Sequence, residues 1–134
     1  MRPGDVRPPS KAIYAQMGEE NVRQMLRDFY QLLGESAIQE MFPVDLETAS
    51  QKSADFFIGL LGGPALYHQR HGNPMMRARH MPFKITTQGR QVWLDCFEAV
   101  LADAPTKYDF PVDELPGFHD FLRGFSMWMV NSAE

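Results

Sequence analysis

The sequence predicts an all-α fold in one domain. Apolar residues recur at helical spacing in several segments, while no segment shows a sustained alternation of apolar and polar residues with period two. Glycine and proline residues separate the periodic segments, and no internal repeat is evident. The chain of 134 residues suits one domain, which buries roughly two-thirds of the surface that the unfolded chain exposes.

The N-terminal quarter is expected to form an arm and two helices. Prolines within residues 1–10 predict a flexible arm, which precedes a single domain spanning residues 11–134. Ser10 is the expected cap of a short helix that ends near Gly18. A second helix with one buried face is predicted to end at Gly34, and its apolar positions are Val22, Met25, Leu26, Phe29, Tyr30 and Leu33.

Proline and glycine punctuate the middle of the chain. Pro43 cuts a short helical turn and disfavours helical geometry at the residue before it, which places Phe42 at a corner. The next helix has Asp45 as its expected cap and runs to Leu61, because Gly-Gly-Pro follows. Residues 64–74 are then predicted to form a loop.

The last part of the chain predicts one brief helix and two longer ones. The brief helix, at residues 75–81, carries His80 and is stopped by the proline that follows it. Thr86 or Thr87 caps a longer helix, whose inward residues are Trp93, Cys96, Phe97, Val100 and Leu101. After a loop at about 103–111, the final helix carries one apolar stripe, formed by Leu115, Phe118, Leu122, Phe125 and Met129.

Composition excludes several classes of protein. Thirteen basic and seventeen acidic residues give a net charge of −4, which argues against a protein that tracks nucleic-acid phosphates. No apolar stretch approaches the ~20 residues that cross a bilayer, and the first ten residues lack the apolar core of a signal peptide. The single cysteine cannot form an internal disulfide, so we expect a cytoplasmic protein with no membrane or nucleic-acid partner.

His80 is the clearest candidate for chemistry. An imidazole on a short rigid helix can coordinate a metal through one ring nitrogen while a backbone carbonyl orients the other. The alternative is a solvated or hydrogen-bonded side chain without a ligand. His68 and His71 are three residues apart, but no Cys, Glu or Asp nearby completes a zinc site. A hydrolase is disfavoured, because Cys96 lies on a face expected to be buried and no G-x-S-x-G motif is present.

Three polar-tipped side chains, Tyr30, Ser53 and Trp93, are expected on the inward faces of three different helices. A buried hydroxyl or indole N–H without a partner costs about 1–3 kcal/mol, so these groups need either mutual hydrogen bonds or a polar ligand. The chain also contains 9 Met and 10 Phe, which either form an ordinary core or adapt to an irregular or planar guest.

Six short motifs occur in one order along the chain. They are Phe29-Tyr30, Phe42-Pro43, Gly62-Gly63-Pro64-x-x-Tyr67, His71-Gly72-x-Pro74, Arg77-x-Arg79-His80-x-Pro82-Phe83 and Trp93-Leu94-x-Cys96. Together, over about residues 14 to 130, the sequence resembles the truncated haemoglobins, in the group typified by a tryptophan at this place (group II). The resemblance implies a globin-like two-over-two helical sandwich that encloses haem b, with His80 as the iron ligand.

The resemblance also implies roles on the ligand side of the haem. Tyr30 matches the tyrosine that hydrogen bonds the ligand, and Trp93 matches an indole donor that also contacts the cofactor. Ala49 and Ser53 match the two helix positions that face the bound gas. Ala49 is smaller than the histidine of ordinary globins, which leaves ligand entry past this helix little hindered.

The remaining cofactor contacts implied by the resemblance are apolar walls and propionate partners. Arg79, Lys52 and, more weakly, Tyr67 are the expected propionate partners, although such rim pairs contribute only about 0–1 kcal/mol each. The expected wall consists of Phe42, Phe56, Phe57, Leu60, Phe83, Ile85, Phe97, Phe125 and Met129.

Two functional classes follow from the resemblance. One is a haem protein that stores, senses or delivers oxygen and binds other diatomic ligands. The other is an oxidative-defence enzyme, either a nitric oxide dioxygenase or a peroxidase-type enzyme, which would need a separate reductase. An all-α binding module without a cofactor is the third hypothesis, and a Soret band in the purified protein would exclude it. The sequence does not indicate the oligomeric state.

Overall fold

The computed structural model describes residues 6–42 and 45–133, and no strand occurs in these ranges. The prediction of an all-α fold is therefore confirmed. The part of the predicted N-terminal arm at residues 1–5 lies outside the described residues, and residues 6–10 form no helix. The helices are α1 (Ile13–Gly34), α2 (Leu46–Leu60), α3 (Leu66–His71), α4 (Met76–His80), α5 (Thr87–Leu101), α6 (Ala104–Lys107) and α7 (Leu115–Met129), with 3₁₀ turns η2 (Gln39–Met41) and η3 (Val112–Glu114).

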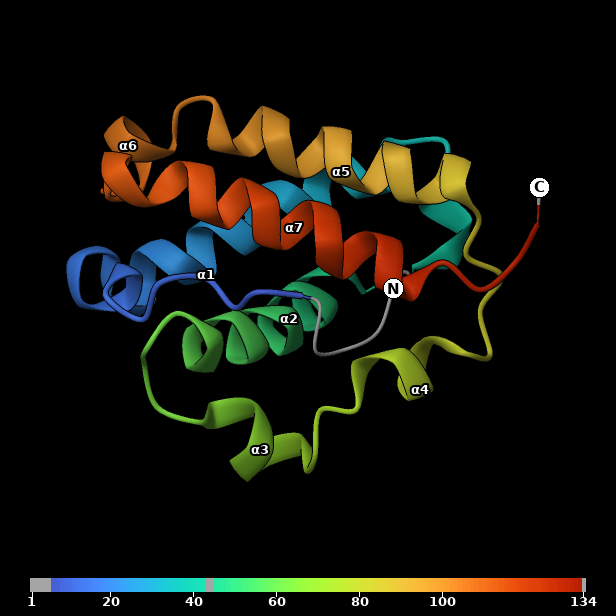
Figure 1. Ribbon diagram of the computed structural model, residues 1–134, viewed down its shortest axis with the longest axis horizontal. Coiled ribbons are helices and arrows are strands. Elements are labelled where there is room, and N and C mark those ends of the chain that lie inside the picture. The colour runs from blue at the N-terminus through green and yellow to red at the C-terminus, as the bar shows by residue number, and fades with distance from the viewer. Residues whose placement is uncertain (1–5, 43–44, 134) are drawn as a thin grey trace.

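Four long helices form the body of the molecule. α1 packs on α2, α5 packs on α7, and contacts between α1 and α5 join the two pairs (Figure 1). The short helices α3 and α4 lie along one edge, where α3 contacts α2 and α4 contacts the end of α7. None of the described helices is both long and apolar enough to cross a membrane.

Two glycines shape the N-terminal half of the fold. The two helices expected on either side of Gly18 are one helix, α1, interrupted at Gly18 by a non-helical backbone with φ 79°. Ser10 does not cap this helix directly, since its hydroxyl accepts a hydrogen bond from Ala12, the residue before α1. Gly62 follows α2 at φ 106°, and a Cβ there would lie 1.9 Å from the carbonyl oxygen of Lys11. Only glycine allows this close approach of two backbone segments.

Both predicted caps of the long helices are present. A carboxylate oxygen of Asp45 accepts the N–H of Thr48 at the start of α2. At the start of α5, the hydroxyl of Thr86 accepts the N–H of Gly89 at 3.0 Å. Each side chain satisfies one of the backbone donors that a helix leaves free at its first turn.

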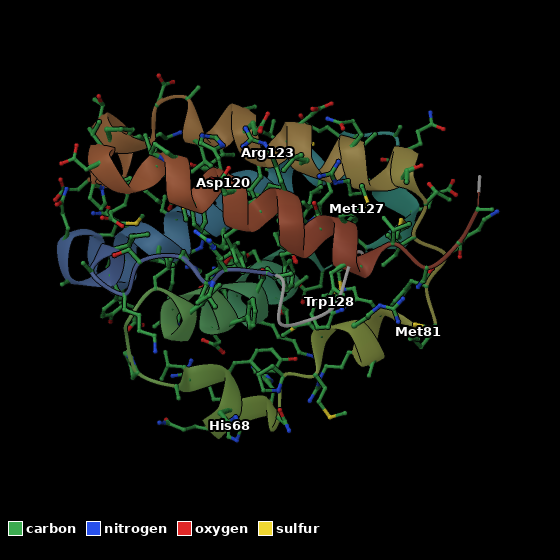
Figure 2. The ribbon with its side chains drawn as sticks, viewed as in Figure 1. His68, Met81, Asp120, Arg123, Met127 and Trp128 are labelled. Atoms are coloured by element: carbon green, nitrogen blue, oxygen red, sulfur yellow. The ribbon has the colours of Figure 1, made fainter. Side chains whose placement is uncertain are left out.

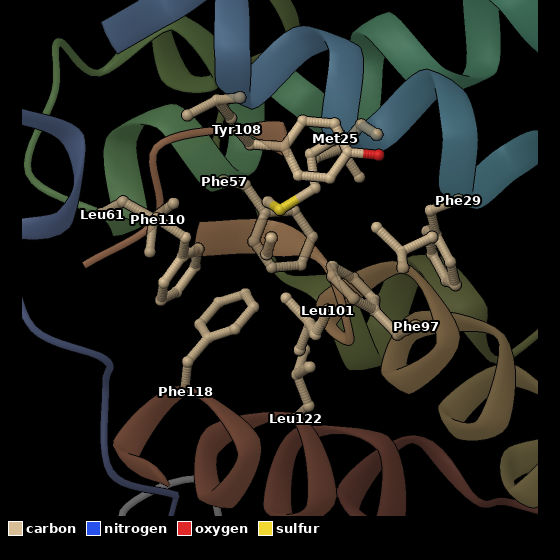
Figure 3. Packing of buried hydrophobic residues seen from close by; sticks show 14 of the residues in the cluster. Met25, Phe29, Phe57, Leu61, Phe97, Leu101, Tyr108, Phe110, Phe118 and Leu122 are labelled. Carbon is tan, nitrogen blue, oxygen red and sulfur yellow. The ribbon is translucent and has the colours of Figure 1, made fainter. Parts of the chain in front are cut away.

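An aromatic cluster fills the core between the two helix pairs (Figure 3). Phe97 of α5 is fully buried, and its ring centroid lies 4.2 Å from that of Phe29 on α1. The same ring lies 5.6 Å from Phe57 on α2 and 5.7 Å from Phe118 on α7. One side chain therefore contacts all three of the other long helices.

The structure corrects two expected loops, because the short helices α3 and α6 lie within them. A helix of six residues is too short to show a periodic apolar pattern, and it depends on contacts with the rest of the fold. Tyr67 of α3 packs edge-on against Phe56 of α2 at 6.1 Å between centroids. α6 begins with the buried Ala104 and has a proline in its first turn.

A buried carboxylate ties α3 to the body of the molecule. Asp55 on α2 accepts hydrogen bonds from Arg23 of α1 at 3.0 Å and from Arg70 of α3 at 2.9 Å, and lies 3.1 Å from Nε2 of His71. Burial alone would raise the pKa of the Asp55 carboxyl. The hydrogen bonds from Arg23 and His71 and the nearby arginine charges outweigh it and hold this pKa below its ordinary value.

The substitution Asp55→Asn should lower the free energy of unfolding by about 3 kcal/mol at neutral pH, because it removes the buried charge that pairs with Arg23 and Arg70 and leaves Glu19 as the carboxylate paired with Arg23. A lowered carboxyl pKa stabilises the fold above the ordinary value of 3.8, and this contribution disappears as the pH falls through the folded pKa. The difference between wild type and variant should therefore close in acid. Urea unfolding followed by circular dichroism measures it, with the exposed Asp95→Asn as control, and equal stability at neutral pH would contradict the prediction.

Candidate functional site

A large cavity of about 670 Å³ opens between the helix pairs and the edge formed by α4. This volume lies within the range of roughly 300–1,000 Å³ that is usual for cofactor and ligand pockets. Apolar and aromatic side chains dominate its lining, with polar groups at a few points. The predicted site residues that line it are Tyr30, Phe42, Ala49, Lys52, Ser53, Phe56, Phe57, Tyr67, Arg79, His80, Phe83, Ile85, Trp93, Phe125 and Met129.

Two residues expected in the cofactor wall, Leu60 and Phe97, do not line the cavity. Phe97 is fully buried in the aromatic core, where it is enclosed by rings from the other long helices. Leu60, at the end of α2, is half-buried and packs against the same core. Both lie on the inward faces of their helices, and spacing alone does not separate a core position from a cavity position.

His80 ends α4 and is half-buried at the cavity. Its Nδ1 lies 2.6 Å from the carbonyl oxygen of Met76, one turn earlier in the same helix. A carbonyl oxygen only accepts hydrogen bonds, so Nδ1 carries the proton and donates it. In the neutral ring, Nε2 then holds a lone pair that can bind a metal.

A bare metal ion would find too few ligands in this structure. Among the described residues, no group of three or more His, Cys, Asp or Glu side chains could hold a metal ion. His71 is occupied by Asp55, and His68 lies on the exposed outer face of α3 (Figure 2). A metal bound by His80 must therefore take its other ligands from a cofactor that contains the metal.

The polar side chains of Tyr30 on α1, Ser53 on α2 and Trp93 on α5 all line the cavity. Burial raises the pKa of the Tyr30 phenol above its ordinary value, although a side-chain hydrogen bond with Ser53 opposes this effect. Tyr30 therefore stays protonated at neutral pH. Trp93 packs edge-on against Phe29 at 5.4 Å between centroids. Within the described ranges, no hydrogen bond is found for its indole N–H, which only donates.

Three cations line the cavity. Arg79 is exposed, lies over the ring of Tyr67 at 5.4 Å, and donates to the carbonyl oxygens of His71 and Asn73. Arg90 donates through Nε to Ser126 at 2.9 Å. No ion pair joins Lys52, Arg79 or Arg90 to a described carboxylate, so these charges are available to an anionic group at the rim.

Sequence reasoning missed eight cavity residues: Ile38, Met41, Asp45, Thr48, Met76, Gly89, Arg90 and Ser126. Helical spacing could have found several of them. Arg90 lies one turn before Trp93, Met76 lies one turn before His80, and Ser126 lies one turn before Met129. These residues share the faces of the side chains that the sequence did identify.

Haem accounts for His80, the apolar lining and the unpaired cations together. Its porphyrin would supply four ligands to the iron, and a histidine such as His80 would supply a fifth and leave one position for a small ligand. Its flat apolar surface matches the lining, and its propionates match the unpaired cations. The fold and the cavity thus define an all-α haem protein.

The comparisons agree with this class. The family model of the bacterial-like globins matches residues 12–119. Group 2 truncated hemoglobin YjbI of Bacillus subtilis is 40% identical over 88 residues, which is 65% of this chain and 67% of that protein. The crystal structure of phosphate-bound Hell's gate globin IV has a TM-score of 0.88 and 34% identity, and covers 96% of this chain and 80% of that one. The X-ray structure of a truncated oxygen-avid haemoglobin from Bacillus subtilis has a TM-score of 0.80 and 32% identity, and covers 88% of this chain and 98% of that one.

The chain belongs to the bacterial-like globin family and is a truncated haemoglobin of group II. The predicted two-over-two sandwich is thereby confirmed as the fold of this family. Haem binding and the binding of small diatomic ligands at its iron follow from membership.

Phe42 supports a prediction about the apolar wall. It follows η2 in an extended conformation, as the expected corner residue, and its ring meets Tyr30 edge-on at 5.8 Å between centroids. Phe42→Ala should lower the stability of the haem-bound protein by about 3–5 kcal/mol, because a large aromatic is removed from packed surroundings.

The cost should be smaller without haem, because Phe42 borders the cavity. Chemical unfolding of the protein with and without haem measures both values. A loss below about 1 kcal/mol in the haem-bound protein would show that Phe42 does not pack on the cofactor.

Proposed function

We propose that this protein binds oxygen reversibly at the iron of haem b, with His80 as the only protein ligand to the iron. The observation that carries the proposal is the hydrogen bond from Nδ1 of His80 to the Met76 carbonyl, which leaves Nε2 for the metal. Haem supplies an iron that binds a diatomic gas. The proposal includes a cytoplasmic location.

The chain holds the cofactor by burial and by charge. The phenylalanines and Met129 that line the cavity remove the macrocycle from water, which supplies most of the affinity together with His80. Arg79 is oriented by backbone carbonyls of the segment between α3 and α4, and Lys52 lies on the exposed face of α2. These two cations are the proposed propionate partners, with Tyr67 as a weaker third.

The ligand is held by donors from α1, α2 and α5. The hydroxyl of Ser53 lies close enough to that of Tyr30 to affect the pKa of the phenol, and either hydroxyl can donate a proton to a polar ligand. Trp93 has no second use for its N–H, which makes it the stronger candidate donor. The side chain of Ala49, one turn before Ser53 on α2, is small, and this leaves room for the gas beside Ser53.

The surroundings of His80 favour gas binding over peroxide chemistry. A carboxylate at Nδ1 would make the imidazole a more basic ligand, whereas the Met76 carbonyl is a neutral acceptor. Asp45 is the described carboxylate that lines the cavity, and it is engaged as the cap of α2 with Thr48. No described carboxylate is thus placed to act on a bound peroxide as general acid or base. The oxygen-avid relative supports the same choice.

His80→Ala should abolish haem retention or weaken it severely, because the iron loses its protein ligand while the apolar walls stay. The Soret absorbance after gel filtration of the purified protein measures retention. His68→Ala is the matched control, since His68 is exposed on α3 and should change nothing. Normal retention in His80→Ala, with an unchanged ferrous spectrum, would overturn the assignment.

Trp93→Phe should quicken oxygen dissociation by about tenfold or more while haem stays bound. A hydrogen bond to a partly charged ligand is worth about 1.5–3 kcal/mol, and every 1.4 kcal/mol is about tenfold. Tyr30→Phe should have a smaller effect, because Ser53 can still donate. Stopped-flow dissociation measures both variants, with Trp128→Phe on α7 as the control for losing a tryptophan.

A change below twofold for Trp93→Phe, together with a large change for Tyr30→Phe, would reverse the two roles. Trp93 would then serve only as a flat wall against the haem.

A further inference from the structure

The segment between His80 and α5 has no regular structure, yet it is held firmly by one residue from the far end of the chain. Asn131 follows α7, and Figure 1 shows this end of the chain beside the link between α4 and α5. The Oδ1 of Asn131 accepts the N–H of Ile85 at 3.0 Å. Its Nδ2 donates to the carbonyl oxygen of Phe83 at 2.9 Å and to that of His80 at 3.3 Å.

The backbone of the same residue adds further contacts. The N–H of Asn131 donates to the carbonyl oxygen of Ile85 at 2.9 Å, and Ser132 donates to the same oxygen at 3.1 Å. The hydroxyl of Ser132 also donates to Oδ1 of Asn131 at 2.8 Å, which fixes the orientation of the amide. The side-chain amide of Asn131 thus accepts from and donates to the backbone of one segment, residues 80–85.

A second contact joins α4 to α7 on the other side of His80. Nε of Arg77 donates to the carbonyl oxygen of Trp128 at 2.9 Å, and Figure 2 shows Trp128 above α4. α4 has five residues and no side-chain cap, so its own hydrogen bonds are too few to keep it in place. The position of His80 therefore depends on α7.

We propose that Asn131 is a positioning residue for His80, fixing the backbone on which the imidazole approaches the iron. The proposal rests on the proposed function, because it takes His80 to be the iron ligand. Residues that orient a metal ligand without touching the metal change metal affinity by about 10–100-fold when they are replaced. Asn131 acts one step further back, through the carbonyl of His80 itself.

Two variants and one control test this role. Asn131→Ala removes both halves of the amide. Asn131→Asp keeps the volume and an acceptor for Ile85 N–H but removes the donor to the carbonyls of Phe83 and His80. Asn21→Ala is the matched control, because Asn21 also donates through Nδ2 to a backbone carbonyl, that of Met17 on α1.

Three measurements separate positioning from mere stability. Amide hydrogen exchange of Ile85 in the haem-free protein reports the contact itself. The iron–histidine stretching band of the ferrous protein, measured by resonance Raman, reports the geometry of His80. Transfer of haem to excess apomyoglobin reports the strength with which the cofactor is held.

We expect Asn131→Ala to lose the protection of the Ile85 amide, to shift the iron–histidine band and to release haem about tenfold faster. Asn131→Asp should keep the protection of Ile85 and still shift the band, and this variant decides the question if the alanine variant does not fold. Asn21→Ala should leave the band and the release rate unchanged.

An unchanged band and release rate in both Asn131 variants would overturn the positioning role while leaving the proposed function intact. Absence of an iron–histidine band in the wild-type protein would instead overturn the assignment of His80, and the positioning role with it. A failure of the proposed function therefore appears in the wild-type protein, whereas a failure of the positioning role appears only when the variants are compared with it.

Discussion

The contact of Phe97 with one ring from each of the other long helices is the interaction on which the fold depends. Phe29, Phe57 and Phe118 come from α1, α2 and α7, so the two helix pairs are joined at one point of dense apolar packing. A short chain that keeps a cavity of about 670 Å³ gives up much of the burial available to it. The tightly packed aromatic core compensates for the apolar burial that the open cavity gives up.

The walls of the cavity are secured by two different kinds of force. The long helices present their lining residues from elements held by apolar packing. The short helices α3 and α4 depend in addition on polar contacts, through Asp55 to α3 and through Asn131 and Arg77 to the region of His80. The ion pairs of Asp55 with Arg23 and Arg70 weaken when acid protonates the carboxylate, so α3 is the part of the cavity edge that a fall in pH loosens first.

The sequence predicted the long helices and their caps because periodic apolar faces and the side chains of Asp45 and Thr86 act locally. It also identified most of the residues that line the cavity, because the family resemblance assigns residues from separate helices to one pocket. It could not predict α3, which is held by contacts with α2: Tyr67 packs on Phe56, and Arg70 pairs with Asp55, fifteen residues earlier in the chain. Nor could it separate Phe97 from the cavity wall or find Asn131, because both depend on how helices pack rather than on spacing along one helix.

The cavity draws its lining from Tyr30 near one end of the chain to Met129 near the other. Contacts between such distant residues form late, since the intervening chain must first be ordered. A growing chain on the ribosome would therefore present α1 and α2 with an incomplete pocket until α7 has emerged. A cavity that encloses the cofactor on all sides therefore requires α7 in place, because Phe125 and Met129 complete its apolar wall.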